Sequence, residues 1–298
     1  MPPTHLRTAG QVSMPSNKDL NRALFIPAPP KCASRTLVAL LKDHLGASVV
    51  RHKIASGHGH LVLNVPETKL HERWISKIGL QKQKKFPLVY GHYPATEHNI
   101  AQLNRRYRAS SVVIPVRPLG ELICSLIHHT RCNKYGPLDP RSAGLIDGIS
   151  DFHQRSESEL FYLLGIFYLP QIYLLIRSWI EATKEDNIPL FFIPFESITN
   201  AQRELMAMFN SLQPKYCLSG TTQPQRDTND IKANISTTHR VRIDSIKSDQ
   251  RESVAAIATK LLGCDESLGE LLPYLLSDLH TPEQRSVAPL AWHFNKDQ

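Results

Sequence analysis

Side chains that bind anions follow the first apolar segment of the chain. Residues 24–37 read LFIPAPPKCASRTL, a β-prone run that leads through a proline-bounded turn into an amphipathic helix. Lys31 and the hydroxyls of Ser34 and Thr36 lie where that helix begins. The N–H groups and the positive dipole end of a helix N-terminus favour anions, and a lysine and two hydroxyls add to that preference. The segment therefore predicts a cradle for a phosphate-like group.

The turn differs from the Walker A loop of ATP-binding proteins. It lacks the glycines of G-x-x-x-x-G-K-[ST], and Lys31 precedes the two hydroxyl residues by three and five positions. A magnesium–ATP enzyme also needs a carboxylate for the metal after a later strand, whereas residues 112–116 are followed by Arg117. We therefore expect a nucleotide whose transferred group needs no magnesium, and no metal site. A divergent P-loop kinase is disfavoured for the same reasons.

Two motifs resemble those of the sulfotransferases that use 3′-phosphoadenylyl sulfate (PAPS). Residues 30–37, PKCASRTL, resemble the 5′-phosphosulfate loop of that family, P-K-x-G-[ST]-[TR]-x-L. The arginine after the hydroxyl residue is most similar to the glycan-modifying members. The second family motif is a strand, an arginine and, eight residues on, a serine. Arg117 and Ser125 have this spacing after the β-prone run 112–116.

Weaker landmarks agree, and two positions depart from the family pattern. Trp179 and residues 193–198, IPFESI, are similar to the family's W…v-x-Y-E-x-[IL] landmark, so the resemblance covers residues 23–212. Ala33 stands where the family usually has glycine, so the backbone is expected to approach the phosphosulfate less closely. Pro118 stands directly after the motif arginine, where the family usually has Asn or Asp before the proline.

The late glycine-rich basic motif, which covers the nucleotide in cytosolic members, is absent from the sequence. Residues 237–242, TTHRVR, stand as its nearest substitute and contain Arg240 and Arg242. This departure and Ala33 keep a second interpretation open. In it the protein is a non-catalytic, sulfotransferase-like protein that binds a nucleotide or an anionic glycan.

The resemblance implies a role for each motif residue, with PAPS as co-substrate and a hydroxyl of a glycan or a small molecule as acceptor. Lys31 is expected to neutralise the bridging oxygen as the sulfuryl group leaves. Arg117 and Ser125 are expected to clamp the 3′-phosphate. The expected PAPS-binding residues are Lys31, Cys32, Ala33, Ser34, Arg35, Thr36, Arg117, Ser125, Arg240 and Arg242. For Arg35, a phosphate ligand and a solvated helix charge are equal alternatives.

The acceptor hydroxyl must lose a proton as it attacks sulfur, and histidine is the usual base near neutral pH. Among the 14 histidines, His92 in residues 89–94, VYGHYP, directly follows a short β-prone run. That position resembles the strand-end histidine that acts as base in many sulfotransferases, so we predict His92 as the catalytic base. His58 and His60 are the alternatives. They form an H-x-H pair without a third metal ligand at a recognised spacing.

Short apolar runs and helix-period segments alternate along the chain. Such alternation is typical of a three-layer α/β fold with a central parallel sheet flanked by helices, and the resemblance implies a P-loop-like version of it. The expected strands are residues 23–26, 61–65, 88–90, 112–116 and 190–193. The expected helices are residues 34–45, 97–106, 119–129, 156–183, 201–212, 248–262 and 267–276.

One sulfotransferase-like domain is expected at residues 22–280. A flexible N-terminal tail at 1–21 and an irregular C-terminal tail at 281–298 flank it. Residues 161–176 carry no formal charge, but the run is shorter than a typical bilayer span and contains Pro170. We therefore expect a buried core helix kinked near that proline and no transmembrane segment.

Composition limits the class of partner and the compartment. Lys and Arg number 35 against 27 Asp and Glu, and the net charge of +8 favours phosphate, sulfate or acidic glycans. Aromatic residues interleaved with basic ones are missing, which disfavours nucleic acid. Basic clusters at 82–85 and 105–108 are either an acceptor channel or solvated faces. Five cysteines without a C-x-x-C pair favour a cytoplasmic setting, with a secretory lumen as the alternative.

Overall fold

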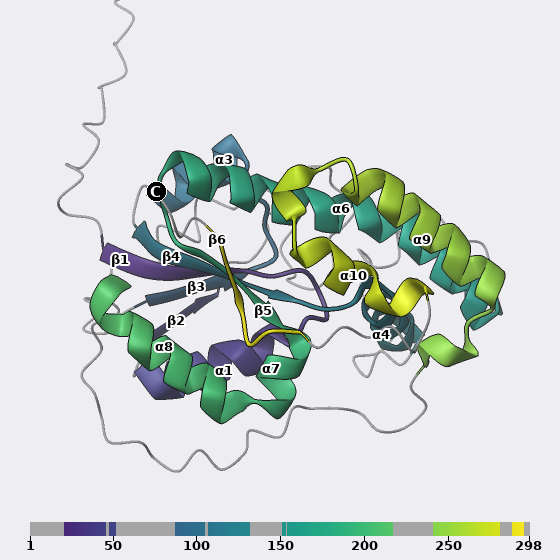
Figure 1. Ribbon diagram of the computed structural model, residues 1–298, viewed down its shortest axis with the longest axis horizontal. Coiled ribbons are helices and arrows are strands. Elements are labelled where there is room, and N and C mark those ends of the chain that lie inside the picture. Colours follow the sequence, from purple (N-terminus) through teal and green to yellow (C-terminus); the bar gives the residue numbers. More distant parts are fainter. Residues whose placement is uncertain are drawn as a thin grey trace, which may run out of the picture.

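A β-sheet runs through the middle of the molecule (Figure 1). The computed structural model describes residues 21–45, 48–51, 87–104, 107–131, 151–152, 154–216, 241–280 and 288–294. Within these residues, six strands lie in the order β2-β3-β1-β4-β5-β6. They are β1 (Asn21–Pro27), β2 (Ser48–Arg51), β3 (Pro87–Gly91), β4 (Tyr107–Val116), β5 (Leu190–Pro194) and β6 (Trp292–Phe294). All neighbours pair in parallel except β6, which is antiparallel to β5. The prediction of an α/β fold with a mostly parallel central sheet is confirmed.

Helices cover both faces of the sheet and make three layers. One face carries α1 (Ser34–Leu45), α7 (Phe195–Asn200) and α8 (Gln202–Tyr216), which share an apolar cluster with the strands. The other face carries α3 (Glu97–Asn104), α4 (Leu119–Arg131), α6 (Glu157–Glu185), α9 (Ser248–Leu262) and α10 (Leu271–His280) around a second cluster. Two apolar clusters on opposite faces require the strands between them to be apolar on both sides.

The central strand β1 meets this requirement residue by residue. Leu24 and Ile26 belong to the cluster around α1 and α8, whereas Ala23 and Phe25 belong to the cluster around α4 and α6. All four side chains are almost completely buried. Successive side chains of a strand point to opposite faces, so a continuous apolar run is what a strand covered on both faces needs.

The long helix α6 packs closely against α9. A Cβ at Gly165 would lie 2.9 Å from Cγ2 of Val254, so this contact requires a glycine. The helix is continuous across Pro170, which is exposed. By length and composition α6 could also cross a membrane, and half of its most apolar 18-residue stretch is buried within the fold.

The ends of the domain differ from the prediction. Asn21 already belongs to β1, and Trp292–Phe294 forms β6 inside the segment 281–298 that was expected to be irregular. Trp292 pairs with Phe192 of β5 and is buried. Burial of an indole ring against the sheet is the physical reason for a strand here.

Other local predictions also differ. The short strand β2 was not predicted. The helix expected at 267–276 begins at Leu271, because Glu266–Leu268 forms a 3-10 turn and Gly269 follows it with a φ of 38°. The strand predicted at 61–65 lies outside the described residues.

Candidate anion-binding site

The carboxyl ends of four parallel strands meet at one edge of the sheet (Figure 1). Residues 28–33, here called the Lys31 loop, follow β1. His92 follows β3, Arg117 follows β4 and Phe195 follows β5. The chain enters α1 on one face after β1, but α4 on the opposite face after the neighbouring strand β4. In open α/β sheets, ligands bind in the crevice at such a reversal.

The Lys31 loop has a backbone conformation suited to an anion. Lys31 has a φ of 66° and Ala33 a φ of 55°, while Cys32 between them is not among the described residues with positive φ. This alternation in the sign of φ is the pattern of a nest, in which successive N–H groups turn toward one concave side and can bind an anion. Non-glycine residues with these φ values are strained and gather at functional sites. The loop therefore has a strained conformation of the kind that phosphate sites use.

Helix α1 begins directly after this nest without a side-chain cap. The carbonyl of Ala33 accepts the first helical hydrogen bond at 3.0 Å, and its methyl group cannot act as an N-cap acceptor. The first-turn N–H groups have no partner within the helix. Ser34 is buried, and its Oγ lies 3.5 Å from the hydroxyl of Tyr90. Thr36 is half-buried and Arg35 is exposed.

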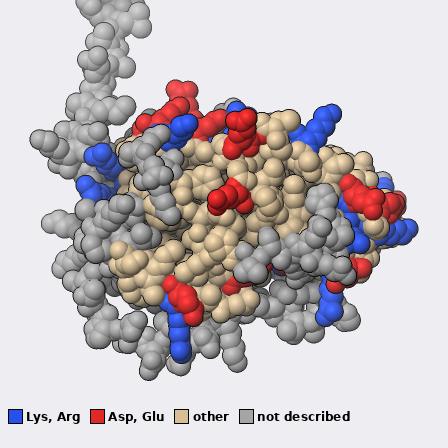
Figure 2. All heavy atoms as spheres, viewed as in Figure 1, with Lys and Arg blue, Asp and Glu red and all other residues tan. Residues whose placement is uncertain are grey.

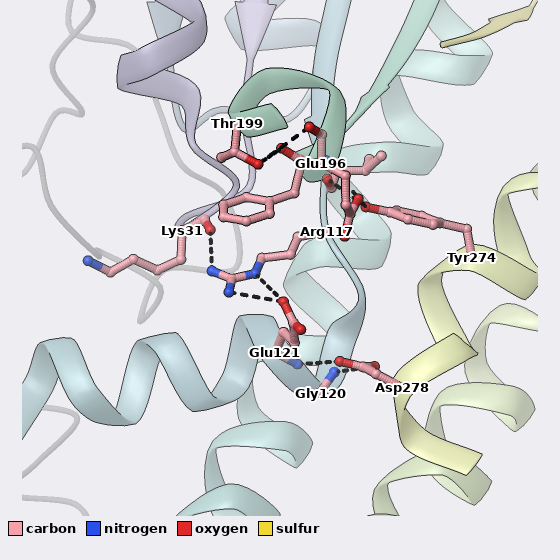
Figure 3. A network of polar contacts seen from close by, with 10 residues as sticks. Lys31, Arg117, Gly120, Glu121, Glu196, Thr199, Tyr274 and Asp278 are labelled. Atoms are coloured by element: carbon pink, nitrogen blue, oxygen red, sulfur yellow. Dashed lines mark hydrogen bonds and ion pairs between the residues drawn. The ribbon is translucent and has the colours of Figure 1, made fainter. Parts of the chain in front are cut away.

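Lys31 is half-buried among other cations. Burial, followed by the positive charges of Arg35 and Arg117, lowers the pKa of Lys31 from 10.5 to about 8. Figure 3 shows the Lys31 side chain extending away from Arg117 while its carbonyl faces the guanidinium. An anion bound among these charges would offset their repulsion and raise the pKa of the lysine again.

Arg117 is bound by three partners within the protein. Its Nε and Nη2 donate to Oε2 of Glu121 at 3.3 and 3.1 Å, and its Nη1 donates to the carbonyl of Lys31 at 3.3 Å (Figure 3). The guanidinium also lies 4.1 Å from the ring centroid of Phe195. The side chain is 8% exposed. Sequence reasoning missed Glu121 and Phe195, although the spacing of Arg117 and Glu121 is that of a helical ion pair.

His92 lies beside the Lys31 loop. Its Nδ1 is 2.5 Å from the carbonyl oxygen of Ala28, and the Ala28 N–H donates to the carbonyl of Gly91 at 2.9 Å. With Nδ1 as the donor, the neutral ring carries its lone pair on Nε2. The ring is half-buried and contacts Tyr90 edge to face at 6.2 Å between centroids. The structure therefore brings the predicted base to the same sheet edge as Lys31 and Arg117.

The thiol of Cys32 is turned into the core. It is completely buried, and burial raises its pKa to about 12. Only the backbone of Cys32 is therefore offered to a ligand. Cys32, Cys124 and Cys264 are free thiols, and the two other cysteines lie outside the described residues.

The remaining predicted site residues lie on other elements or outside the described residues. Ser125 is half-buried in the second turn of α4, and Arg242 is exposed just before the 3-10 turn Ile243–Ser245. Arg108 is exposed on β4. The residues outside the described part are Arg240, His58, His60, the basic cluster 82–85 and residues 105–106.

Asp278 of α10 caps the N-terminus of α4. Its Oδ1 accepts from the N–H of Gly120 at 3.0 Å and its Oδ2 from the N–H of Glu121 at 2.5 Å. A Cβ at Gly120 would lie 2.8 Å from Cδ1 of Ile243 and 3.0 Å from Cγ of Asp278, so only glycine permits this approach. Burial raises the pKa of Asp278 to about 6. The cap holds the helix turn that carries Glu121, the partner of Arg117.

The raised pKa of Asp278 predicts a pH dependence of stability. From its ordinary value of 3.8 to about 6, the folded protein binds this proton more tightly than the unfolded chain does. The contribution of protonated Asp278 to the free energy of unfolding is therefore fully present below pH 4 and is lost as the pH rises through 6. Asp278→Asn does not titrate, so the wild type should lose stability relative to this variant by at most about 3 kcal/mol between pH 4 and 7.5.

Urea denaturation of both proteins across this pH range measures the difference. Asp244→Asn is the matched control, because Asp244 is an exposed aspartate. A wild-type-minus-variant difference that stays constant with pH would contradict the assignment to Asp278.

Charge alone does not locate the site. In the face shown in Figure 2, described Lys and Arg side chains lie at the margins among Asp and Glu rather than in one patch. The cations of the candidate site differ from these, because Lys31 is half-buried and Arg117 is buried.

No model of a known protein family matches the chain, and no curated protein matches it.

Proposed function

We propose that the protein transfers a sulfuryl group from PAPS to a hydroxyl acceptor, and we favour a carbohydrate as that acceptor. The observation that carries the proposal is the alternating backbone of the Lys31 loop at the reversal of the sheet connections, directly before α1. Lys31 belongs to this loop, and Arg117 and His92 each contact a carbonyl of its backbone. The motif resemblance supplies the identity of the nucleotide, and a P-loop-like assignment of the fold is part of the same proposal.

The proposed step forms one bond and breaks one bond at sulfur. The acceptor oxygen bonds to sulfur as the bond from sulfur to the bridging oxygen of PAPS breaks. The acceptor proton moves to Nε2 of His92, and the electron pair of the broken bond stays on the bridging oxygen, where the Lys31 ammonium neutralises it. The products are the sulfated acceptor and adenosine 3′,5′-bisphosphate.

The phosphate groups are assigned to the loop and to the start of α4. The N–H groups of the nest and the hydroxyls of Ser34 and Thr36 bind the 5′-phosphosulfate. Arg117 and Ser125 bind the 3′-phosphate. Each of these groups is a hydrogen-bond donor, which suits the negatively charged phosphate and sulfate oxygens of PAPS.

A second candidate is a protein that binds the nucleotide without turnover. Two observations favour it. Ala33 brings a Cβ to the nest at a φ of 55°, and Arg117 is already paired with Glu121 at 3.1 Å. Nucleotide binding is common to both candidates, so binding tests the site and turnover separates the candidates.

The protein should bind adenosine 3′,5′-bisphosphate equally well in magnesium and in EDTA, because the assigned ligands are cations, hydroxyls and N–H groups. It should bind 5′-AMP about 10- to 100-fold more weakly, since one charged contact is lost. Isothermal titration calorimetry measures both affinities. Equal affinities for the two nucleotides would remove the 3′-phosphate contact from the proposal.

An assay with sulfur-labelled PAPS against a panel of glycans, small alcohols and phenols then separates the candidates. Transfer of label to any acceptor supports the enzyme. Tight binding of PAPS with no transfer across the panel, and no hydrolysis, supports the binding protein.

A further inference from the structure

A hydrogen bond joins Arg117, which follows β4, to the Lys31 loop, which follows β1. Nη1 of Arg117 donates to the carbonyl of Lys31 at 3.3 Å. Figure 3 shows this oxygen turned toward the guanidinium, while the lysine side chain leaves in the other direction. Arg117 therefore contacts the backbone of the Lys31 loop and not its ammonium group.

This contact sets the orientation of the peptide unit between Lys31 and Cys32. The peptide is planar, and there are no cis peptides among the described residues, so the carbonyl of Lys31 and the N–H of Cys32 point in opposite directions. A carbonyl held against Arg117 directs the Cys32 N–H to the opposite, concave side of the nest. Since the Cys32 side chain is buried in the core, this N–H is the polar group that Cys32 can offer.

The guanidinium itself has a fixed orientation. Glu121 accepts from its Nε and Nη2, and its Cζ lies over the ring of Phe195. Asp278 in turn holds the N–H of Glu121. A planar fork satisfies these partners and the Lys31 carbonyl together, which the compact ammonium of a lysine cannot do.

A positive φ at Lys31 is unfavourable for a residue with a Cβ, so the loop needs contacts that maintain it. We infer that Arg117 is a positioning residue of the Lys31 loop, whose hydrogen bond to the Lys31 carbonyl keeps the following N–H turned toward the bound anion. This role is additional to the 3′-phosphate contact, and it rests on the proposed function only for the choice of nucleotide probes.

The experiment uses 5′-AMP, which has no 3′-phosphate, beside adenosine 3′,5′-bisphosphate. Arg117→Met keeps an unbranched side chain over Phe195 but donates no hydrogen bond, and Arg117→Lys keeps the charge without the fork. Arg203→Met, at an exposed position of α8, is the matched control. Calorimetry gives both affinities, and amide hydrogen exchange reports on peptides covering residues 28–37. Thermal melting identifies which variants are folded.

Both Arg117 variants should bind 5′-AMP about 10-fold more weakly than the wild type and should exchange faster at residues 28–37. Arg203→Met should change neither. Should Arg117→Met fail to fold, Arg117→Lys alone carries the comparison. Weaker bisphosphate binding with unchanged 5′-AMP affinity and unchanged exchange would make Arg117 a 3′-phosphate ligand only and overturn the inference.

Failure of the proposed function gives a different result. In that case the wild type binds neither nucleotide, and hydrogen exchange alone decides the inference. Faster exchange confined to residues 28–37 in the Arg117 variants supports it, and exchange equal to the wild type overturns it.

Discussion

Replacing Lys31 with methionine should lower the turnover of PAPS-dependent sulfation by about 10²- to 10³-fold, the effect of removing one group that stabilises developing charge. Affinity for PAPS should fall much less, because the ammonium contact strengthens only as the bridging oxygen gains charge, and in bound PAPS this oxygen still joins sulfur to phosphorus. Single-turnover measurements with labelled PAPS separate the two effects. Lys42→Met, at an exposed position of the following helix α1, is the matched control.

The pKa of Lys31 adds a pH test to this experiment. Because its pKa in the free protein is about 8, the ammonium is present below that pH and is lost as the pH rises through it. Wild-type affinity for the bisphosphate should therefore fall as the pH rises above 8, and that of Lys31→Met should not. Weakened binding with unchanged turnover would make Lys31 an ordinary ground-state ligand.

Replacing His92 with asparagine should lower turnover by about 10²-fold or more, the typical effect of losing a general base. Asparagine keeps an N–H donor for the carbonyl of Ala28, to which Nδ1 of His92 is bound, but it accepts no proton at neutral pH. Bisphosphate affinity should stay close to that of the wild type. The pH profile of kcat in the wild type should show a group that must be deprotonated, and the variant should lack it.

His98→Asn is the matched control, because His98 is an exposed histidine on the nearby helix α3. His92→Asn with full turnover would show that His92 only joins the ends of β1 and β3. Equal losses of turnover and of bisphosphate affinity would mean that the ring positions the Lys31 loop and is not the base.

Most of the architecture could be predicted because strands buried on two faces and amphipathic helices have distinct patterns. The helix at 34–45 and the helix at 248–262 have the predicted bounds. The strand β2 was missed because only two of its four residues, Val49 and Val50, are apolar. The strand β6 was missed because its three residues depend on a distant partner, β5, and not on a local period.

The candidate site could be predicted only where its residues follow strand ends. Lys31, His92 and Arg117 were found in this way, because parallel strands bring their carboxyl ends to one edge. The cap that Asp278 forms on α4 could not be predicted, because Asp278 and Glu121 are 157 residues apart in the sequence. The left-handed backbone at Ala33 was equally hidden, because alanine carries no signal for a positive φ.

The two apolar clusters on opposite faces of the sheet have a mechanical consequence. The Lys31 loop leads into α1, which belongs to one cluster, and Arg117 leads into α4, which belongs to the other. An anion bound between them would contact the segments that lead into both helical layers and would oppose movement of one layer relative to the other. We therefore expect that occupancy of this small site would slow amide hydrogen exchange in both α1 and α4.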